Sequence, residues 1–276
     1  MKKTLTSMAM AAMLTMVMGV LLVIGRQELA PKKAMGTSAS IMDELSKVEN
    51  YIYDKYSDYK DIDISLEKDK YIDTKNYNQD VWNNWYYLDT GIKAGGTCTV
   101  VATASLLEYC GNKYNISAIK DRTAKPNGTY IIFCEIIDNM WFYGHATSKQ
   151  IRGVSHSRLD SNLTQMFTKY GSSLKGNNDY YDIYDSLKSE VNSDKPVLFS
   201  MIGHTTVGAG YVEYEVEYTK KYWWGKQDGY ATEKFIVVND GWTNSIAYPK
   251  RQYSYFPERE IDTGIYRYQF GITKVK

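Results

Sequence analysis

The sequence predicts an α+β protein, because helical and extended patterns occupy different halves of the chain. Residues 41–58 carry apolar side chains at intervals of three and four, which is typical of one face of an amphipathic helix. Further helical patterns follow at 159–170 and 181–192. Short apolar runs rich in β-branched and aromatic residues then indicate strands. These predicted strands are 196–202, 204–216 and 235–238. Helices followed by strands favour an α+β order over a βαβ repeat.

Length and charge narrow the classes of function. The chain has 276 residues, which allows one domain of about 200 residues with additional N-terminal segments. Its formal net charge is +1. A protein that binds nucleic acid usually carries a basic excess, so we expect no nucleic-acid partner. The 26 tyrosines suit half-buried strands and wet surfaces, as in an extracellular domain.

The N-terminal residues are typical of an export signal. Lys2 and Lys3 precede an almost wholly apolar run at residues 8–24. This run is longer than a usual signal core and shorter than a comfortable membrane span. It is therefore a cleaved signal peptide, an uncleaved anchor or a buried helix. We expect a secreted or cell-surface protein that contacts a membrane only through this segment, if it stays uncleaved.

We divide the chain into three parts. Residues 1–30 are the signal peptide or anchor. Residues 31–78 are a linker followed by a helical segment, which is either a pro-segment over the active site or the N-terminal helix of the domain. Residues 79–276 form the domain that carries the chemistry.

Cys98 has the placement of a nucleophile. It follows a Gly-Gly-Thr turn and opens a predicted helix, whose N-terminus carries about half a positive charge and stabilises a thiolate. The alternative is a small buried cysteine in a core helix. Cys110, at the other end of this helix, and Cys134, in a strand-like run, are predicted core residues. They form a disulfide with each other, or all three thiols are reduced.

His204 and Asn239 are the candidate partners of this thiol. Small residues surround His204 at the start of a predicted strand and leave room for a substrate, whereas His145 follows an aromatic cluster and His156 lies in a polar loop. Asn239 ends a predicted buried strand, where its side-chain oxygen can orient an imidazole. Asp240 is the alternative orienting group. The alternative interpretation is that Asn239-Asp240-Gly241 forms only a hairpin turn and that His204 is a structural histidine.

In this order, the three motifs resemble the papain-like superfamily of cysteine peptidases. The segment from Cys98 is similar to that of bacterial streptopain-like peptidases, and the Asn239-Asp-Gly-Trp segment to other secreted bacterial papain-like domains. The resemblance spans residues 79–276. It implies a nucleophile-bearing central helix packed against an antiparallel sheet or partial barrel, with Cys98 as nucleophile, His204 as base and Asn239 as orienting residue.

The oxyanion hole departs from the family pattern. The superfamily usually supplies a glutamine six residues before the nucleophile, and this chain has Ile92 there. The streptopain-like group places its side-chain donor further upstream, near a tryptophan. The resemblance therefore implies Asn84 or Gln79 as the side-chain donor to the oxyanion hole. The Cys98 backbone N–H would be the second donor. Trp82 and Trp85 otherwise indicate aromatic core packing.

An apparent insertion at residues 212–234 predicts a long β-hairpin. Alternating apolar residues indicate its first strand, and the turns are expected at Trp223-Trp224-Gly225 and Asp228-Gly229. Exposed aromatic residues there could bind substrate or cell-wall glycan. Alternatively, the insertion is a stabilised loop.

These observations predict a thiol hydrolase that cleaves peptide or amide bonds through a Cys98 acyl-enzyme. The alternatives are a cell-wall amidase, a transglutaminase-like acyl transferase and an inactive papain-like binding module. The acyl transferase would use Asp240 in place of Asn239 as the third residue of the site. The chain lacks His-x-x-x-His and Cys-x-x-Cys spacings, so we expect no metal or other cofactor. We expect a monomer that acts on a peptide or protein substrate.

Overall fold

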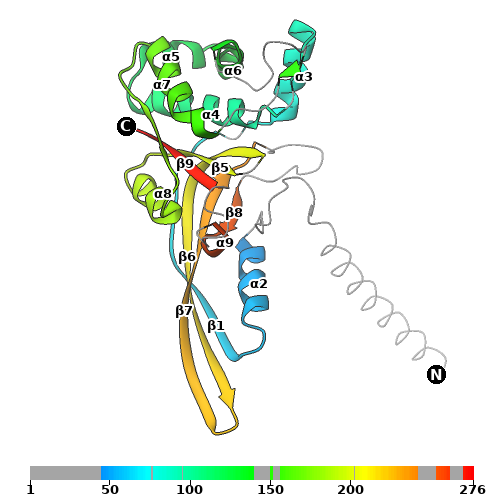
Figure 1. Ribbon diagram of the computed structural model, residues 1–276, viewed down its shortest axis with the longest axis vertical. Helices are drawn as coiled ribbons and strands as arrows, with labels where there is room; N and C mark the ends of the chain where they lie inside the picture. The colour runs from blue at the N-terminus through cyan, green and yellow to red at the C-terminus, as the bar shows by residue number, and fades with distance from the viewer. Residues whose placement is uncertain are drawn as a thin grey trace, which may run out of the picture. The chain divides into compact units, whose positions relative to one another are not determined.

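An open antiparallel sheet lies at the centre of the molecule (Figure 1). The computed structural model describes residues 45–75, 77–94, 96–139, 150–151, 156–201, 203–241, 253–261 and 270–276. The strands follow the order β4-β9-β5-β6-β7-β8, and β1 pairs with β6 outside this path. The predicted α+β class is confirmed. The sheet is open, so the expected partial barrel does not close.

The strands of the main sheet vary widely in length. They are β1 (Lys60–Tyr71), β4 (Gly176–Asp179), β5 (Val197–Met201), β6 (His204–Tyr222), β7 (Gly225–Asn239), β8 (Ser254–Pro257) and β9 (Phe270–Val275). Every pairing among them is antiparallel. A separate short parallel pair joins β2 (Lys93–Ala94) to β3 (Gln150–Ile151). The long β6 and β7 form the predicted hairpin, whose turn lies at Trp223-Trp224, while Asp228-Gly229 lies inside β7.

Most helices gather at one end of this sheet (Figure 1). The helical segments are α2 (Leu45–Lys55), α3 (Gln79–Thr90), α4 (Cys98–Lys113), α5 (Ser117–Thr123), α6 (Gly128–Asn139), η1 (His156–Arg158), α7 (Leu159–Lys169), α8 (Ile183–Asn192) and α9 (Glu258–Ile261). None of these described helices is both long and apolar enough to span a bilayer.

The central helix of the helical layer is α4. It packs against α5, α6, β5 and β6, and most of its residues are buried. A helix that is apolar on nearly all sides belongs inside a core. Val100 and Ala104 of α4 meet Phe133 of α6 and Val207 of β6 in this first core cluster. The helix thereby fixes its first residue, Cys98, against the sheet.

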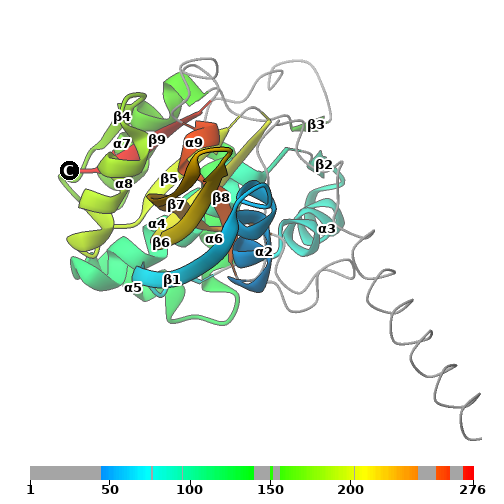
Figure 2. The ribbon, with the colours of Figure 1, turned by 90° about the horizontal axis from the view of Figure 1, so that it is seen from below.

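A second core cluster lies further along the hairpin. Val48 and Ile52 of α2 are fully buried against Val212 and Val216 of β6 and Phe235 of β7. Figure 2 shows α2 beside the strands β1 and β6. The apolar residues of the predicted helix at 41–58 therefore cover the long strands.

Several predicted elements agree with the structure and two do not. The helices α2, α7 and α8 and the strand β5 lie where the sequence predicts them. Cys134 lies in the helix α6, so its predicted strand is wrong. The helix expected to end at Cys110 is longer than predicted, because α4 continues to Lys113 and packs Gly111 closely against Ile119.

Residues 45–78 are structurally continuous with the domain that follows them. The strand β1 pairs with β6 along residues 60–71, so it is a member of the main sheet. All described residues belong to one compact unit, 37–276. The division after residue 78 stays a prediction. The predicted signal at 1–30 lies outside the described residues.

Candidate active site

Cys98 is the first residue of α4. Thr97 before it makes no side-chain capping bond to the helix, and Gly96 adopts a positive φ of 67°. The first N–H groups of a helix lack partners within the helix, and the Thr99 N–H bonds to the Cys98 thiol instead. The predicted turn and helix start are therefore confirmed at this position. The predicted Gly95 of that turn lies outside the described residues.

His204 is the first residue of β6. It pairs with Met201 across the β5–β6 connection, where Gly203 adopts a positive φ of 77°. The side chain is buried, with 6% of its surface exposed. The small residues around it in the sequence serve this tight connection between two paired strands.

Cys98 and His204 are hydrogen-bonded to one another. Burial is the largest single influence and raises the pKa of the Cys98 thiol, whereas the hydrogen bond with His204 and its charge lower it. All the lowering contributions together hold that pKa below its ordinary value. The backbone N–H groups of Thr205 and Thr99 add to this lowering. Burial alone lowers the pKa of His204, yet its hydrogen bond with Cys98 raises it overall. Both directions favour a thiolate–imidazolium pair.

The other side of the His204 ring meets a backbone carbonyl. His204 Nε2 lies 3.0 Å from the Asp240 carbonyl oxygen, an acceptor that fixes this nitrogen as the N–H donor. The Asp240 carboxylate is buried and accepts a hydrogen bond of 2.7 Å from Ser254. Its charge also raises the pKa of His204. Asp240 therefore orients the His204 ring through its main chain, and its carboxylate favours the charged imidazole.

The prediction that Asn239 orients His204 is wrong in this structure. Asn239 Nδ2 donates to the Thr74 carbonyl at 2.8 Å and also to the Thr74 hydroxyl. Its buried Oδ1 has no hydrogen-bond partner among the described residues. The side chain of Asn239 thus holds the connection between β1 and α3, and the next residue along the chain takes the orienting role.

The β1–α3 connection, residues 72–79 except Asn76, ties the site together. Ile72 N–H donates to the Ala209 carbonyl at 2.7 Å. Lys75 and Tyr77 both bond to the buried carboxylate of Glu108 on α4. At its end, the Gln79 N–H donates to the Gly241 carbonyl at 3.0 Å. The connection therefore bridges α4 and the sheet, the two elements that carry Cys98 and His204.

The two oxyanion-hole candidates differ in their placement. Gln79 is buried against Gly241, the residue after Asp240, and its Oε1 has no partner among the described residues. Asn84 is exposed on α3. Asn83 was not predicted, although it lies one helical turn after Gln79 and therefore on the same face. Its side chain accepts a hydrogen bond from Thr97, the residue before Cys98. Gln79 and Asn83 thus border the site.

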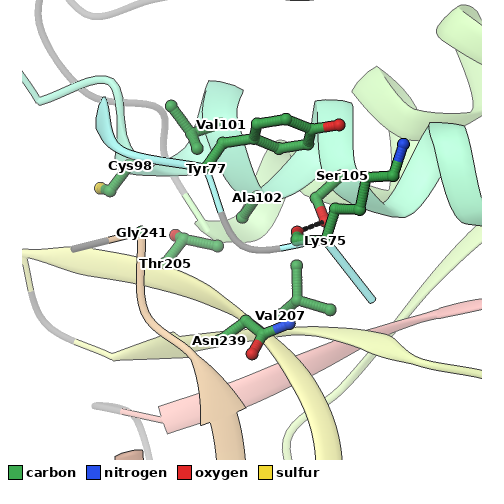
Figure 3. A pocket seen from close by; sticks show the side chains of 10 residues that line it. All are labelled: Lys75, Tyr77, Cys98, Val101, Ala102, Ser105, Thr205, Val207, Asn239 and Gly241. Atoms are coloured by element: carbon green, nitrogen blue, oxygen red, sulfur yellow. Dashed lines mark hydrogen bonds between the residues drawn. The ribbon is translucent and has the colours of Figure 1, made fainter. Parts of the chain in front are cut away.

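A small cavity of about 10 Å³ lies behind Cys98 (Figure 3). It is bounded by the β1–α3 connection, α4 and the sheet, with Tyr77, Ala102 and Val207 in its wall. Figure 3 shows the Cys98 sulfur pointing away from this cavity. Its volume suits about one water molecule, so it is too small to hold a substrate.

Cys110, Cys134 and His156 are not part of this pair. Cys110 and Cys134 are free thiols, so the possible disulfide between them is not present. Burial raises the pKa of Cys110 to about 12, which leaves it protonated and inert. Burial lowers the pKa of His156 to about 4. His145 lies outside the described residues.

No group of three or more histidine, cysteine or acidic side chains in the described part of the chain is arranged to hold a metal ion. The chain matches no family model, no curated protein and no solved structure. Any functional conclusion therefore depends on the geometry of the pair formed by Cys98 and His204.

Proposed function

We propose that this protein is a thiol hydrolase with a papain-like arrangement, which cleaves peptide or amide bonds. One observation carries the proposal: a thiol at a helix start is hydrogen-bonded to an imidazole, and their pKa values shift in opposite directions. A structural cysteine that is buried without a hydrogen-bonded imidazole would have a raised pKa, as Cys110 has despite the nearby charge of Lys113.

The reaction would begin with attack of the Cys98 thiolate on the substrate carbonyl carbon. The carbonyl electrons move to oxygen, and free N–H groups at the start of α4 stabilise the oxyanion. Gln79 is our candidate for the side-chain donor, because it is buried beside Gly241. The His204 imidazolium then donates its proton to the departing amine, which leaves a thioester on Cys98.

Water would release the acyl group. Neutral His204 removes a proton from the water as it attacks the thioester carbonyl, and collapse of the second oxyanion regenerates the Cys98 thiolate. The Asp240 carbonyl holds the ring through Nε2 during both steps. We also propose export to the cell surface, on the pattern of residues 1–30.

Replacement of Cys98 tests the proposal. Cys98→Ala should abolish hydrolysis of casein or of cell-wall peptides while the circular dichroism spectrum is kept. Cys110→Ser, in the same helix, should remain active in proportion to its folded fraction. Cleavage of casein would indicate a peptidase, and cleavage of cell-wall peptides would indicate a wall amidase. Incorporation of an amine into a substrate would indicate an acyl transferase. Undiminished hydrolysis by Cys98→Ala, or no selective alkylation of Cys98 by iodoacetamide, would contradict the proposed chemistry.

A further inference from the structure

The far end of the β6–β7 hairpin carries a group of exposed aromatic side chains. Trp223 is 92% exposed and Trp224 is 67% exposed. The rings of Tyr222 and Trp224 stack with centroids 4.7 Å apart, and Trp223 meets Trp224 edge-on at 5.3 Å. A contiguous exposed aromatic patch marks an interaction site on a folded protein more often than an isolated exposed residue does. We call residues 220–226 the hairpin tip.

Two large aromatic residues form the turn at the tip. The strand β6 ends at Tyr222 and β7 begins at Gly225, so Trp223 and Trp224 alone form the turn. Two-residue turns favour glycine, asparagine or aspartate, because these residues accept a positive φ. Neither tryptophan is among the described residues with positive φ. Gly225, which follows them, has a positive φ of 152° and supplies the residue that such a turn favours, so the turn itself does not require two large exposed rings.

Positive charge surrounds these rings. Lys221 and Lys226 are both exposed and lie directly opposite one another across the hairpin. Like charges in this position repel, and neither lysine forms an ion pair with a described residue. Lys220 lies over the rings of Tyr59 and Tyr218. The tip has three lysines and no acidic residue, so it complements an anionic surface.

The tip is remote from the candidate active site. His204 and Tyr222 are the two ends of β6, and a strand rises about 3.3 Å per residue, which separates them by roughly 60 Å. Figure 1 shows the hairpin leading away from the helices around Cys98. The exposed rings therefore do not line the site at Cys98.

We propose that the hairpin tip docks onto a membrane surface that contains anionic lipids. Tryptophan and tyrosine favour the boundary between lipid and water, and nearby lysines are attracted to anionic headgroups. A neutral sugar would gain little from the three lysines, whereas an anionic headgroup would be attracted to them. The proposal does not depend on the chemistry of Cys98. Docking would hold the active-site end of the hairpin tens of ångströms from the lipid.

Tryptophan quenching in vesicles tests this proposal. The full chain is bound to phosphatidylcholine vesicles with and without phosphatidylglycerol, and brominated lipids quench tryptophans that enter the membrane. We expect additional quenching in the anionic vesicles, which a Trp223→Ser/Trp224→Ser variant should lose. Lys221→Gln/Lys226→Gln should lose at least half of it. Every variant keeps residues 1–30, so any membrane binding by that segment contributes equally.

Tyr181→Ser is the matched control, because Tyr181 is 64% exposed and lies outside the hairpin. It should quench as the wild type does, and circular dichroism confirms that each variant is folded. Equal quenching in neutral and anionic vesicles, or unchanged quenching in the double tryptophan variant, would overturn the proposal. So would tryptophan-dependent pelleting with peptidoglycan in the absence of lipid quenching. Each result is independent of hydrolysis by Cys98.

Discussion

At the scale of single residues, the protonation of Cys98 follows from its partner. Burial raises the pKa of this thiol, and the hydrogen bond and charge of His204 are the largest contributions that lower it. A thiol is deprotonated above its pKa, so the lowered pKa of Cys98 keeps the thiolate populated at lower pH. Without His204, burial would remain the largest influence on the pKa of Cys98 and would raise it, so that the thiolate would form only at higher pH.

We therefore predict that His204→Ala slows alkylation of Cys98 at pH 7 by about tenfold or more, because an ordinary thiol is only a few per cent ionised there. Its pH profile should shift to higher pH. Mass spectrometry of iodoacetamide-treated protein between pH 5 and 10 measures both effects. Cys110 is an internal control, since its pKa of about 12 should leave it unlabelled throughout. Superimposable profiles for the wild type and the variant would refute this account of the pair.

Variants of the neighbouring residues Asn239 and Asp240 can distinguish the orientation of the His204 ring from the stability of the fold. Asn239→Ala leaves the bond between His204 and the Asp240 carbonyl in place, so the pH profile of alkylation should be unchanged. It removes the donor to the Thr74 carbonyl, which should lower the free energy of unfolding by about 1–3 kcal/mol in urea denaturation. A shifted profile with unchanged stability would return the orienting role to Asn239.

Asp240→Asn keeps the same carbonyl but removes a charge that raises the pKa of His204. Imidazolium exists below its pKa, so a lower pKa should move the alkaline limb of the hydrolysis profile to lower pH. Ser254 can still donate to the amide oxygen, which limits the loss of stability. Rates measured from pH 5 to 10 test this effect, and an unmoved alkaline limb would contradict the role given to the carboxylate.

At the scale of secondary-structure elements, the β1–α3 connection holds α4 against the sheet through Glu108. This buried carboxylate accepts hydrogen bonds from Lys75, Tyr77 and Thr129. We predict that Glu108→Ala lowers the free energy of unfolding by about 3 kcal/mol, because hydrogen bonds to charged groups each contribute about 1.5–3 kcal/mol. Urea denaturation measures this loss.

Two variants sharpen that test. Glu108→Gln keeps an acceptor for Tyr77 and Thr129 and loses only the charge, so its loss should be clearly smaller than that of the alanine variant. Glu67→Ala removes an exposed carboxylate from β1 and should stay within about 0.5 kcal/mol of the wild type. A Glu108→Ala variant as stable as Glu67→Ala would show that the connection does not hold the helix.

The elements differ in how far the sequence could predict them. The apolar spacing of α2 and the Gly-Gly-Thr turn before Cys98 are local signals, and both lead to the observed elements. The strand β1 was missed because its side chains are mostly exposed, so it lacks an apolar period. The choice between Asn239 and Asp240 depends on Thr74, more than 160 residues away, which no local pattern reveals.

At the scale of the whole molecule, the strand β6 joins two cores. Val207 belongs to the core under α4, whereas Val212 and Val216 belong to the core under α2. Between them, Gly210 lies so close to β1 that an added Cβ would meet the Lys70 carbonyl at 2.4 Å. A single strand with tight packing between the cores should make them unfold together.

We therefore predict that Ile52→Ala, in the core under α2, accelerates labelling of Cys110 in the other core. Ile52 is fully buried, and its truncation should lower the free energy of unfolding by about 2–5 kcal/mol. If both cores open in one step, labelling of Cys110 under native conditions should become about 30-fold faster or more, since 1.4 kcal/mol corresponds to a tenfold change. Mass spectrometry of a Cys98→Ser background isolates this thiol, with Tyr181→Ala as the surface control. An unchanged labelling rate of Cys110 in a destabilised Ile52→Ala variant would mean that the hairpin and the helical layer unfold separately. The lower stability of the core under α2 would then not increase the opening of the core around α4.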